Sequence, residues 1–172
     1  MGRRKKIVLS QGEAFCGDIL KKLELNSTPQ YRIASLPRYR FDYHFIHQEK
    51  EYLLEFDGRQ HFEFTSWFHR SKRSFYNKRT RDLLKSTVAL MSGYYLIRIA
   101  HCDLVRAEEI IREALSGESR LYFSNKETYS YLRTTKIPKS WLEKYGQHLN
   151  LGNKTQPEFL KRKITLRRNT TS

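Results

Sequence analysis

The sequence predicts an α/β fold in which a mixed central sheet is flanked by helices. Two aromatic-rich apolar runs, 39–46 and 51–57, are separated by the polar stretch 47–50, a pattern typical of a β-hairpin. Further along, a helical pattern over 76–91 leads through a glycine to an apolar strand at 94–99. A helix that leads into a strand in this way indicates a crossover to a parallel neighbour.

The first helix is expected to run from residue 11 to residue 25, after a basic arm over residues 1–9. Ser10 is a favourable N-cap, and Glu13 three residues later completes a capping-box pattern. Helical spacing predicts four core-facing side chains, which are Phe15, Ile19, Leu20 and Leu23. A loop over 26–30 is then expected to precede a short strand at 31–33.

The hairpin carries three carboxylates on two adjacent strands that should be mostly buried. They are Asp42 on the first strand, and Glu55 and Asp57 on the second. Because side chains alternate along a strand, Glu55 and Asp57 share one face. Buried carboxylates are usually paired or bound to a cation, so the pattern favours a metal site. The alternative, solvated charges on an exposed sheet face, stays open at this point.

Magnesium is the cation that suits such a site, because it prefers carboxylate oxygens and keeps several of its waters. Asp42 and Glu55 would hold one ion between the two strands, and Asp57 would help to hold it or would orient a water. His61 follows the second strand closely. Because the unperturbed pKa of histidine lies near neutrality, His61 is a candidate general acid or base.

The helix expected over 76–91 places several charged residues three or four positions apart, on one face. They are Lys78, Arg79, Asp82 and Lys85. A solvated face is one interpretation of them, and a contribution to the site is the other. A further helix is expected from Asp103 to Leu115, and a short strand at 121–123.

Taken together, the residues Asp42, Glu55, Asp57, Gln60 and His61, with the phrase RDLLKSTVALMSGYYLIRI at 81–99, carry a family resemblance. Over roughly residues 10–115 the chain resembles the PD-(D/E)XK nucleases. It is most similar to the Vsr-like branch, which holds the very-short-patch-repair endonucleases and homing endonucleases with an EDxHD signature. Asp57 stands where the standard motif has a lysine, and the zinc-binding cluster of the repair enzymes is missing.

The resemblance implies a restriction-endonuclease-like core and Mg²⁺-dependent hydrolysis of DNA phosphodiester bonds, with Mn²⁺ as a substitute ion. It makes Glu13 and Asp82 further catalytic candidates beside Asp42, Glu55, Asp57, Gln60 and His61. Capping of its own helix is the alternative role of Glu13. Flanking phosphates would be bound by basic residues, namely Arg38, Arg40, Arg59, Lys78, Arg79 and Lys85. Two alternatives remain: a nuclease-like fold that binds nucleic acid without cutting it, and a nuclease that acts on RNA.

Composition points to the same partner. The 172 residues carry a net charge of +15, which favours a polyanion such as nucleic acid, and DNA first. The apolar runs are too short for a membrane span, and we expect no membrane partner. The N-terminus lacks a secretory pattern, and the two isolated cysteines, Cys16 and Cys102, fit a reduced intracellular compartment. A monomer and a homodimer are both compatible with the sequence.

The expected organisation has three parts. A nuclease core with its basic N-terminal arm occupies 1–117, and a C-terminal extension packed on that core occupies 118–153. A basic tail occupies 154–172 and is expected to be flexible. The tail would bind phosphates without sequence preference, or would simply add solubility.

Overall fold

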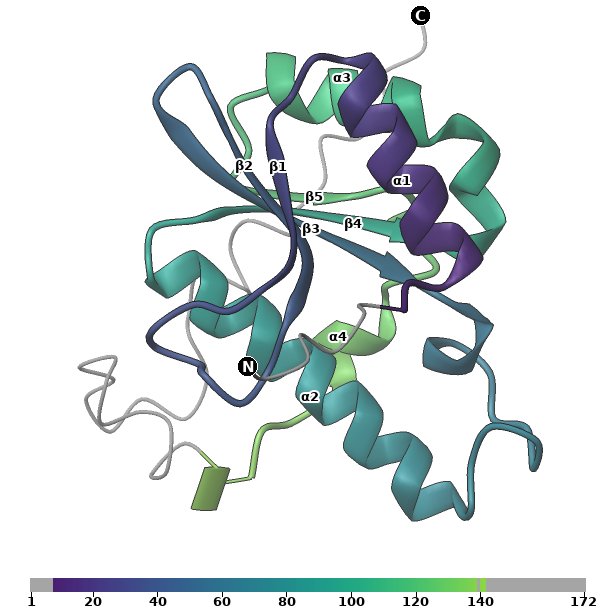
Figure 1. Ribbon diagram of the computed structural model, residues 1–172. Coiled ribbons are helices and arrows are strands. Elements are labelled where there is room, and N and C mark those ends of the chain that lie inside the picture. The colour runs from purple at the N-terminus through teal and green to yellow at the C-terminus, as the bar shows by residue number, and fades with distance from the viewer. Residues whose placement is uncertain (1–7, 139, 142–172) are drawn as a thin grey trace, which may run out of the picture.

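The structure, a computed structural model, describes residues 8–138 and 140–141. One five-stranded sheet in the order β1-β2-β3-β4-β5 lies at the centre, with α1 and α3 on one face and α2 on the other (Figure 1). The α/β class and the mixed sheet flanked by helices are therefore confirmed. The main elements are α1 (Gln11–Lys22), β1 (Ser27–Tyr31), β2 (Phe41–His47), β3 (Lys50–Asp57), η1 (Arg59–His61), α2 (Lys72–Met91), β4 (Tyr95–Ala100), η2 (His101–Arg106), α3 (Ala107–Ser116), β5 (Leu121–Phe123) and α4 (Tyr131–Thr134).

The predicted hairpin and the predicted crossover are both present. Strands β2 and β3 pair antiparallel through a two-residue connection at Gln48 and Glu49. Both residues have positive φ, 48° and 62°, as the tight turns of hairpins require. Strand β4 then pairs parallel to β3, with Arg98 opposite Glu55, because α2 carries the chain back across the sheet.

Helix α1 begins as the sequence indicates and ends earlier. The Ser10 side chain accepts the Glu13 N–H at 3.2 Å, and Glu13 Oε2 accepts the Ser10 N–H at 3.4 Å, which confirms the capping box. The helix ends at Lys22 rather than at residue 25, because Glu24 adopts a positive φ of 57°. The prediction for Phe15 is wrong, since that side chain is 45% exposed while Cys16 packs in the core.

Other boundaries shift where tertiary pairing overrides local pattern. The stretch expected as a loop is edge strand β1, which pairs with β2 and carries Pro29 opposite Tyr43. Helix α2 begins earlier than expected because Ser71 caps it. The helix expected from Asp103 begins only at Ala107, after a 3-10 turn. The Asp103 carboxylate accepts the Ser124 hydroxyl at 2.8 Å instead of capping that helix.

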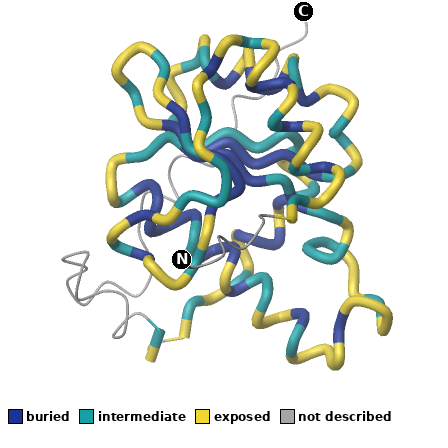
Figure 2. Tube along the Cα trace, viewed as in Figure 1, coloured by how far each residue is buried: buried dark blue, intermediate teal, exposed yellow. Residues whose placement is uncertain are grey.

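Burial is greatest in the central strands β3 and β4 (Figure 2). Residues 118–138 add to this core, since β5 pairs with β4 and both Tyr129 and Tyr131 are buried. Within residues 8–138 and 140–141, no helix combines the length and the apolar character needed to cross a membrane. Most of the basic arm, and the whole tail over 154–172, lie outside the described residues.

Candidate functional site

The three carboxylates of the hairpin are buried. Asp42 is 9% exposed, Glu55 5% and Asp57 1%. The interpretation of these residues as solvated charges on an open sheet face is therefore wrong. Since an ionised group removed from water needs a compensating partner, the partners of each carboxylate determine what the site can do.

Asp57, at the end of β3, is held by a buried arginine of the neighbouring strand. Arg98 donates to both carboxylate oxygens, at 2.8 Å from Nε and 2.6 Å from Nη2. The Tyr129 hydroxyl donates to Oδ2 at 2.7 Å. Burial opposes ionisation of Asp57, but the Arg98 charge, with the hydrogen bonds from Arg98 and Tyr129, outweighs it and lowers the pKa to about 2. Asp57 is thus an ionised carboxylate whose oxygens are already occupied by donors.

Asp82, on α2, completes the surroundings of the same guanidinium. Its Oδ1 lies 3.4 Å from Arg98 Nη2, and its Oδ2 accepts the Tyr131 hydroxyl at 3.2 Å. Arg98 Nη1 also donates to the backbone carbonyl of Asp82 at 3.1 Å and to Ser86 Oγ at 3.0 Å. The interpretation of Asp82 as part of a solvated helix face is therefore wrong.

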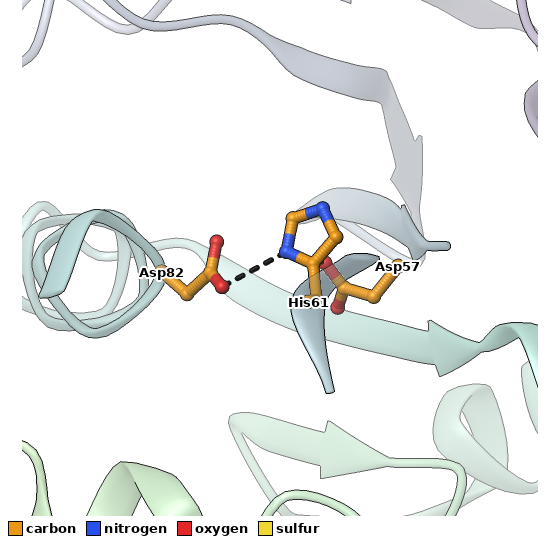
Figure 3. A group of neighbouring side chains, drawn as sticks. All are labelled: Asp57, His61 and Asp82. Atoms are coloured by element: carbon orange, nitrogen blue, oxygen red, sulfur yellow. Dashed lines mark hydrogen bonds and ion pairs between the residues drawn. The ribbon is translucent and has the colours of Figure 1, made fainter. Parts of the chain in front are cut away.

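His61, in the short turn η1, lies between the two aspartates (Figure 3). Its Nδ1 is 2.9 Å from Asp82 Oδ2 and 3.3 Å from Asp57 Oδ1. Figure 3 shows the second ring nitrogen pointing away from both carboxylates. Two acceptors at Nδ1 favour the tautomer that carries its proton there. The other nitrogen is then free to exchange a proton with a bound molecule.

We call this group of six residues the buried charge cluster. It consists of Asp57, His61, Asp82, Arg98, Tyr129 and Tyr131. Asp57, His61 and Asp82 each offer a ligand atom, and these atoms lie within 4.8 Å of one another, as a metal would require. Arg98, however, already supplies a cation there. Burial disfavours its charged form, but Asp57 and Asp82 outweigh burial and raise its pKa. A metal ion bound there would lie close to the positive guanidinium, and the two charges would repel each other. We therefore regard the cluster as complete without an ion.

Asp42 and Glu55, which we call the carboxylate pair, are less well compensated. Asp42 Oδ2 accepts the backbone N–H of Phe56 at 2.7 Å. Burial raises the pKa of Asp42 well above its usual range, and the nearby Glu55 charge raises it further. Burial likewise raises the pKa of Glu55, although the opposing charge of Lys85 reduces the effect. Ionisation of both acids is therefore unfavourable in the present surroundings, and a further cation beside them would favour it.

Lys85 of α2 provides that pair with its one close side-chain cation among the described residues. Its ammonium forms an ion pair with Glu55 Oε1 and donates to the Arg40 carbonyl at 2.6 Å. It also lies 4.8 Å from the centre of the Phe41 ring. The sequence suggested that Lys85 binds phosphate, whereas the structure places its ammonium on a predicted metal ligand.

Glu13 and Gln60 are the two remaining catalytic candidates. Glu13 caps its own helix and also accepts Gln30 Nε2 at 3.3 Å, while its charge contributes to the raised pKa of Asp42. The Gln60 side chain folds back over Gly58, where an added Cβ would lie 2.5 Å from Gln60 Oε1. Its backbone carbonyl faces His69 Nε2 at 3.0 Å.

The remaining predicted phosphate contacts separate into two groups. Arg38, Arg40 and Arg59 are exposed, and Arg59 forms an ion pair with Glu63 at 2.7 Å. Arg79 instead donates to the Phe62 carbonyl at 2.9 Å and lies over the rings of Phe75 and Tyr131, which indicates a structural role. Lys78 is half-buried, and burial lowers its pKa.

Arg98, Tyr129 and Tyr131 were not among the residues that the sequence indicated. Arg98 had a signal, because a charged residue inside the apolar strand at 94–99 needs a buried carboxylate partner. The tyrosines had none, since they lie more than 45 residues beyond the acids they contact, with separations of 72 and 49 positions.

Comparisons of the chain with models of protein families, with curated proteins and with solved structures return no match.

Proposed function

We propose that this protein is a Mg²⁺-dependent endonuclease that hydrolyses phosphodiester bonds of DNA. The carboxylate pair carries the proposal, because two buried acids with raised pKa values sit together and share a single lysine. Their oxygens are the donors that Mg²⁺ prefers. The presence of an ammonium against Glu55 supports this fit, since it marks a position where positive charge is favourable.

In this proposal Asp42 and Glu55 would hold the ion. When bound, the metal would neutralise charge on the phosphoryl oxygens of the substrate. Asp57 stays a predicted third ligand, but its contacts with Arg98 and Tyr129 favour a role in orienting His61. His61 would move the proton at its second ring nitrogen. Arg40, whose backbone carbonyl accepts a hydrogen bond from Lys85, is exposed, as is Arg38 two residues before it, and both would bind flanking phosphates.

A cleavage assay with a matched pair of variants tests the proposal. Supercoiled plasmid, and in parallel a labelled single-stranded RNA, would be incubated with the protein in Mg²⁺, Mn²⁺ or EDTA. Nicking of the plasmid is expected with either metal, and none with EDTA. Asp42→Asn should abolish nicking, whereas Asp18→Asn, which neutralises an exposed carboxylate of α1, should leave it unchanged.

The two alternatives give different results in the same assay. DNA binding without nicking in any metal would favour a nuclease-like binding protein, and would refute the enzymatic proposal. Cleavage of RNA with an intact plasmid would place the activity on the other nucleic acid. Equal nicking by Asp42→Asn and the wild type would remove the carboxylate pair from the mechanism.

A further inference from the structure

Lys85 lies in an unusual position for a residue expected to bind substrate. Its side chain is only 14% exposed, and its ammonium is against the carboxylate of Glu55, whose side chain is 6% exposed. An ion pair shielded in this way is screened less by water and salt than a surface pair. The ammonium also donates to the Arg40 carbonyl, so two separate acceptors fix it at the carboxylate pair.

The same carboxylate cannot serve two cations at full strength. A divalent ion bound to Glu55 would place two positive charges within a few ångströms of the Lys85 ammonium, and like charges at such distances repel strongly in a partly buried site. Glu55 has no other cationic side chain in direct contact among the described residues. Lys85 and a divalent ion must therefore compete for Glu55.

We propose that Lys85 is the resident counter-cation of the carboxylate pair, and that a divalent ion binds there only by displacing its ammonium from Glu55. This inference rests on the metal site of the proposed function and adds a step to it. In the metal-free protein the ammonium keeps the two buried acids from facing each other unpaired. Metal binding would release the ammonium from Glu55 and make it available to a phosphoryl oxygen of a bound nucleic acid.

Competition makes a prediction opposite to that of a simple supporting role. If Lys85 only held Glu55 in place, its removal would weaken metal binding. If it competes with the metal, its removal strengthens metal binding. The sign of the change in metal affinity therefore separates the two roles, and no substrate or cleavage is needed to observe it.

Mn²⁺ affinity would be measured without nucleic acid, from the free-ion signal in electron paramagnetic resonance, for the wild type, Lys85→Gln and Lys72→Gln. Lys72 is exposed on the same helix, 13 residues and therefore about 20 Å from Lys85 along the axis. Its removal changes the net charge equally, but it lies beyond the Debye length of about 8 Å at physiological salt. We expect Lys85→Gln to bind Mn²⁺ at least about tenfold more tightly, within the usual range of site coupling. Lys72→Gln should stay within about twofold of the wild type.

A second measurement on the wild type does not depend on a variant that folds. Limited acetylation followed by mass spectrometry would compare the reactivity of Lys85 and Lys72 with and without Mg²⁺. Displacement predicts that Mg²⁺ raises the reactivity of Lys85 and leaves that of Lys72 unchanged. Unchanged or lower reactivity of Lys85 under conditions where the ion binds would overturn the inference.

Asp42→Asn separates failure of this inference from failure of the proposed function. If Asp42→Asn loses Mn²⁺ binding while Lys85→Gln binds it no better than the wild type, only the competition is refuted. If Asp42→Asn binds Mn²⁺ as well as the wild type does, the metal does not sit on the carboxylate pair, and both are refuted. Absence of Mn²⁺ binding in both the wild type and Lys85→Gln also refutes both.

Discussion

Replacing Arg98 by methionine should be one of the most destabilising single changes in this chain. Arg98 is among the largest fully buried side chains, and it donates to Asp57, to the Asp82 carbonyl and to Ser86. Methionine fills a similar volume but supplies no donor. The substitution leaves Asp57 and Asp82 facing each other in the interior without their shared cation.

The geometry allows the size of this effect to be bracketed. The pKa of Asp57 is lowered from 3.8 to about 2 against the opposing effect of burial, with Arg98 the main cause. A difference of that size corresponds to about 2 kcal/mol of stability. Removing one partner of a buried ion pair generally costs about 3–5 kcal/mol, because the remaining charge is left without compensation. We therefore expect Arg98→Met to lower the free energy of unfolding by about 2–5 kcal/mol.

Urea unfolding followed by circular dichroism, between pH 7 and pH 3, would measure the loss. The folded pKa of Asp57 lies below its unfolded value. Its contribution to stability is therefore fully present above about pH 4 and is lost as the pH falls toward about 2. The difference between the wild type and Arg98→Met should accordingly be largest near neutrality and shrink below about pH 4.

A double-mutant cycle with Asp57→Asn provides the control. Once Asp57 is neutral, removal of Arg98 should cost less than it does in the wild type, because one of the two buried carboxylates no longer needs a cation. A loss below about 1 kcal/mol in Arg98→Met, or strictly additive effects in the cycle, would refute the role given to the buried charge cluster.

Three other predictions concern the site and the partner. In the metal-free protein at pH 7, Asp42→Asn should unfold at a higher urea concentration than the wild type, because burial and Glu55 raise the pKa of Asp42 and make its ionised form unfavourable. The gain should fade as the pH falls below about 4, because the carboxyl then becomes protonated in the unfolded state as well, and Asp18→Asn should show no such gain. His61→Ala should lower the maximal cleavage rate by about 10²–10⁴-fold with little change in Mn²⁺ affinity, and a normal rate with a lower melting temperature would make His61 a packing residue. Deleting residues 154–172, which hold six basic residues against one acid, should weaken DNA binding and flatten its salt dependence; equal binding at every salt concentration would leave the tail a solubilising end.

Local signals in the sequence determined much of the fold. The capping box at Ser10 and Glu13, the hairpin and the helix-to-strand crossover each depend on residues close together in the chain. Such features can be predicted because short-range sterics and hydrogen bonding decide them. The start of α3 could not be predicted, since Asp103 finds a tertiary partner in Ser124 and does not cap the helix.

The sequence also determined which acids are unusual. Three carboxylates on a hairpin that must be half-buried need partners, and that need follows from the alternation of side chains along strands. The sequence could not determine which cationic side chain pairs with which carboxylate. Arg98 forms ion pairs with Asp57 and Asp82, and Lys85 forms one with Glu55.

Only the tertiary structure decided which ion pairs form, because each pair joins elements that lie far apart in the chain. Asp57 and Arg98 meet through parallel pairing of β3 with β4, and Tyr129 reaches Asp57 from beyond β5. A charge in the interior is stabilised by whichever opposite charge the fold places within a few ångströms, and sequence separation does not enter that energy. The residue types therefore follow from the sequence, and their pairing follows from the packing of the sheet against α2.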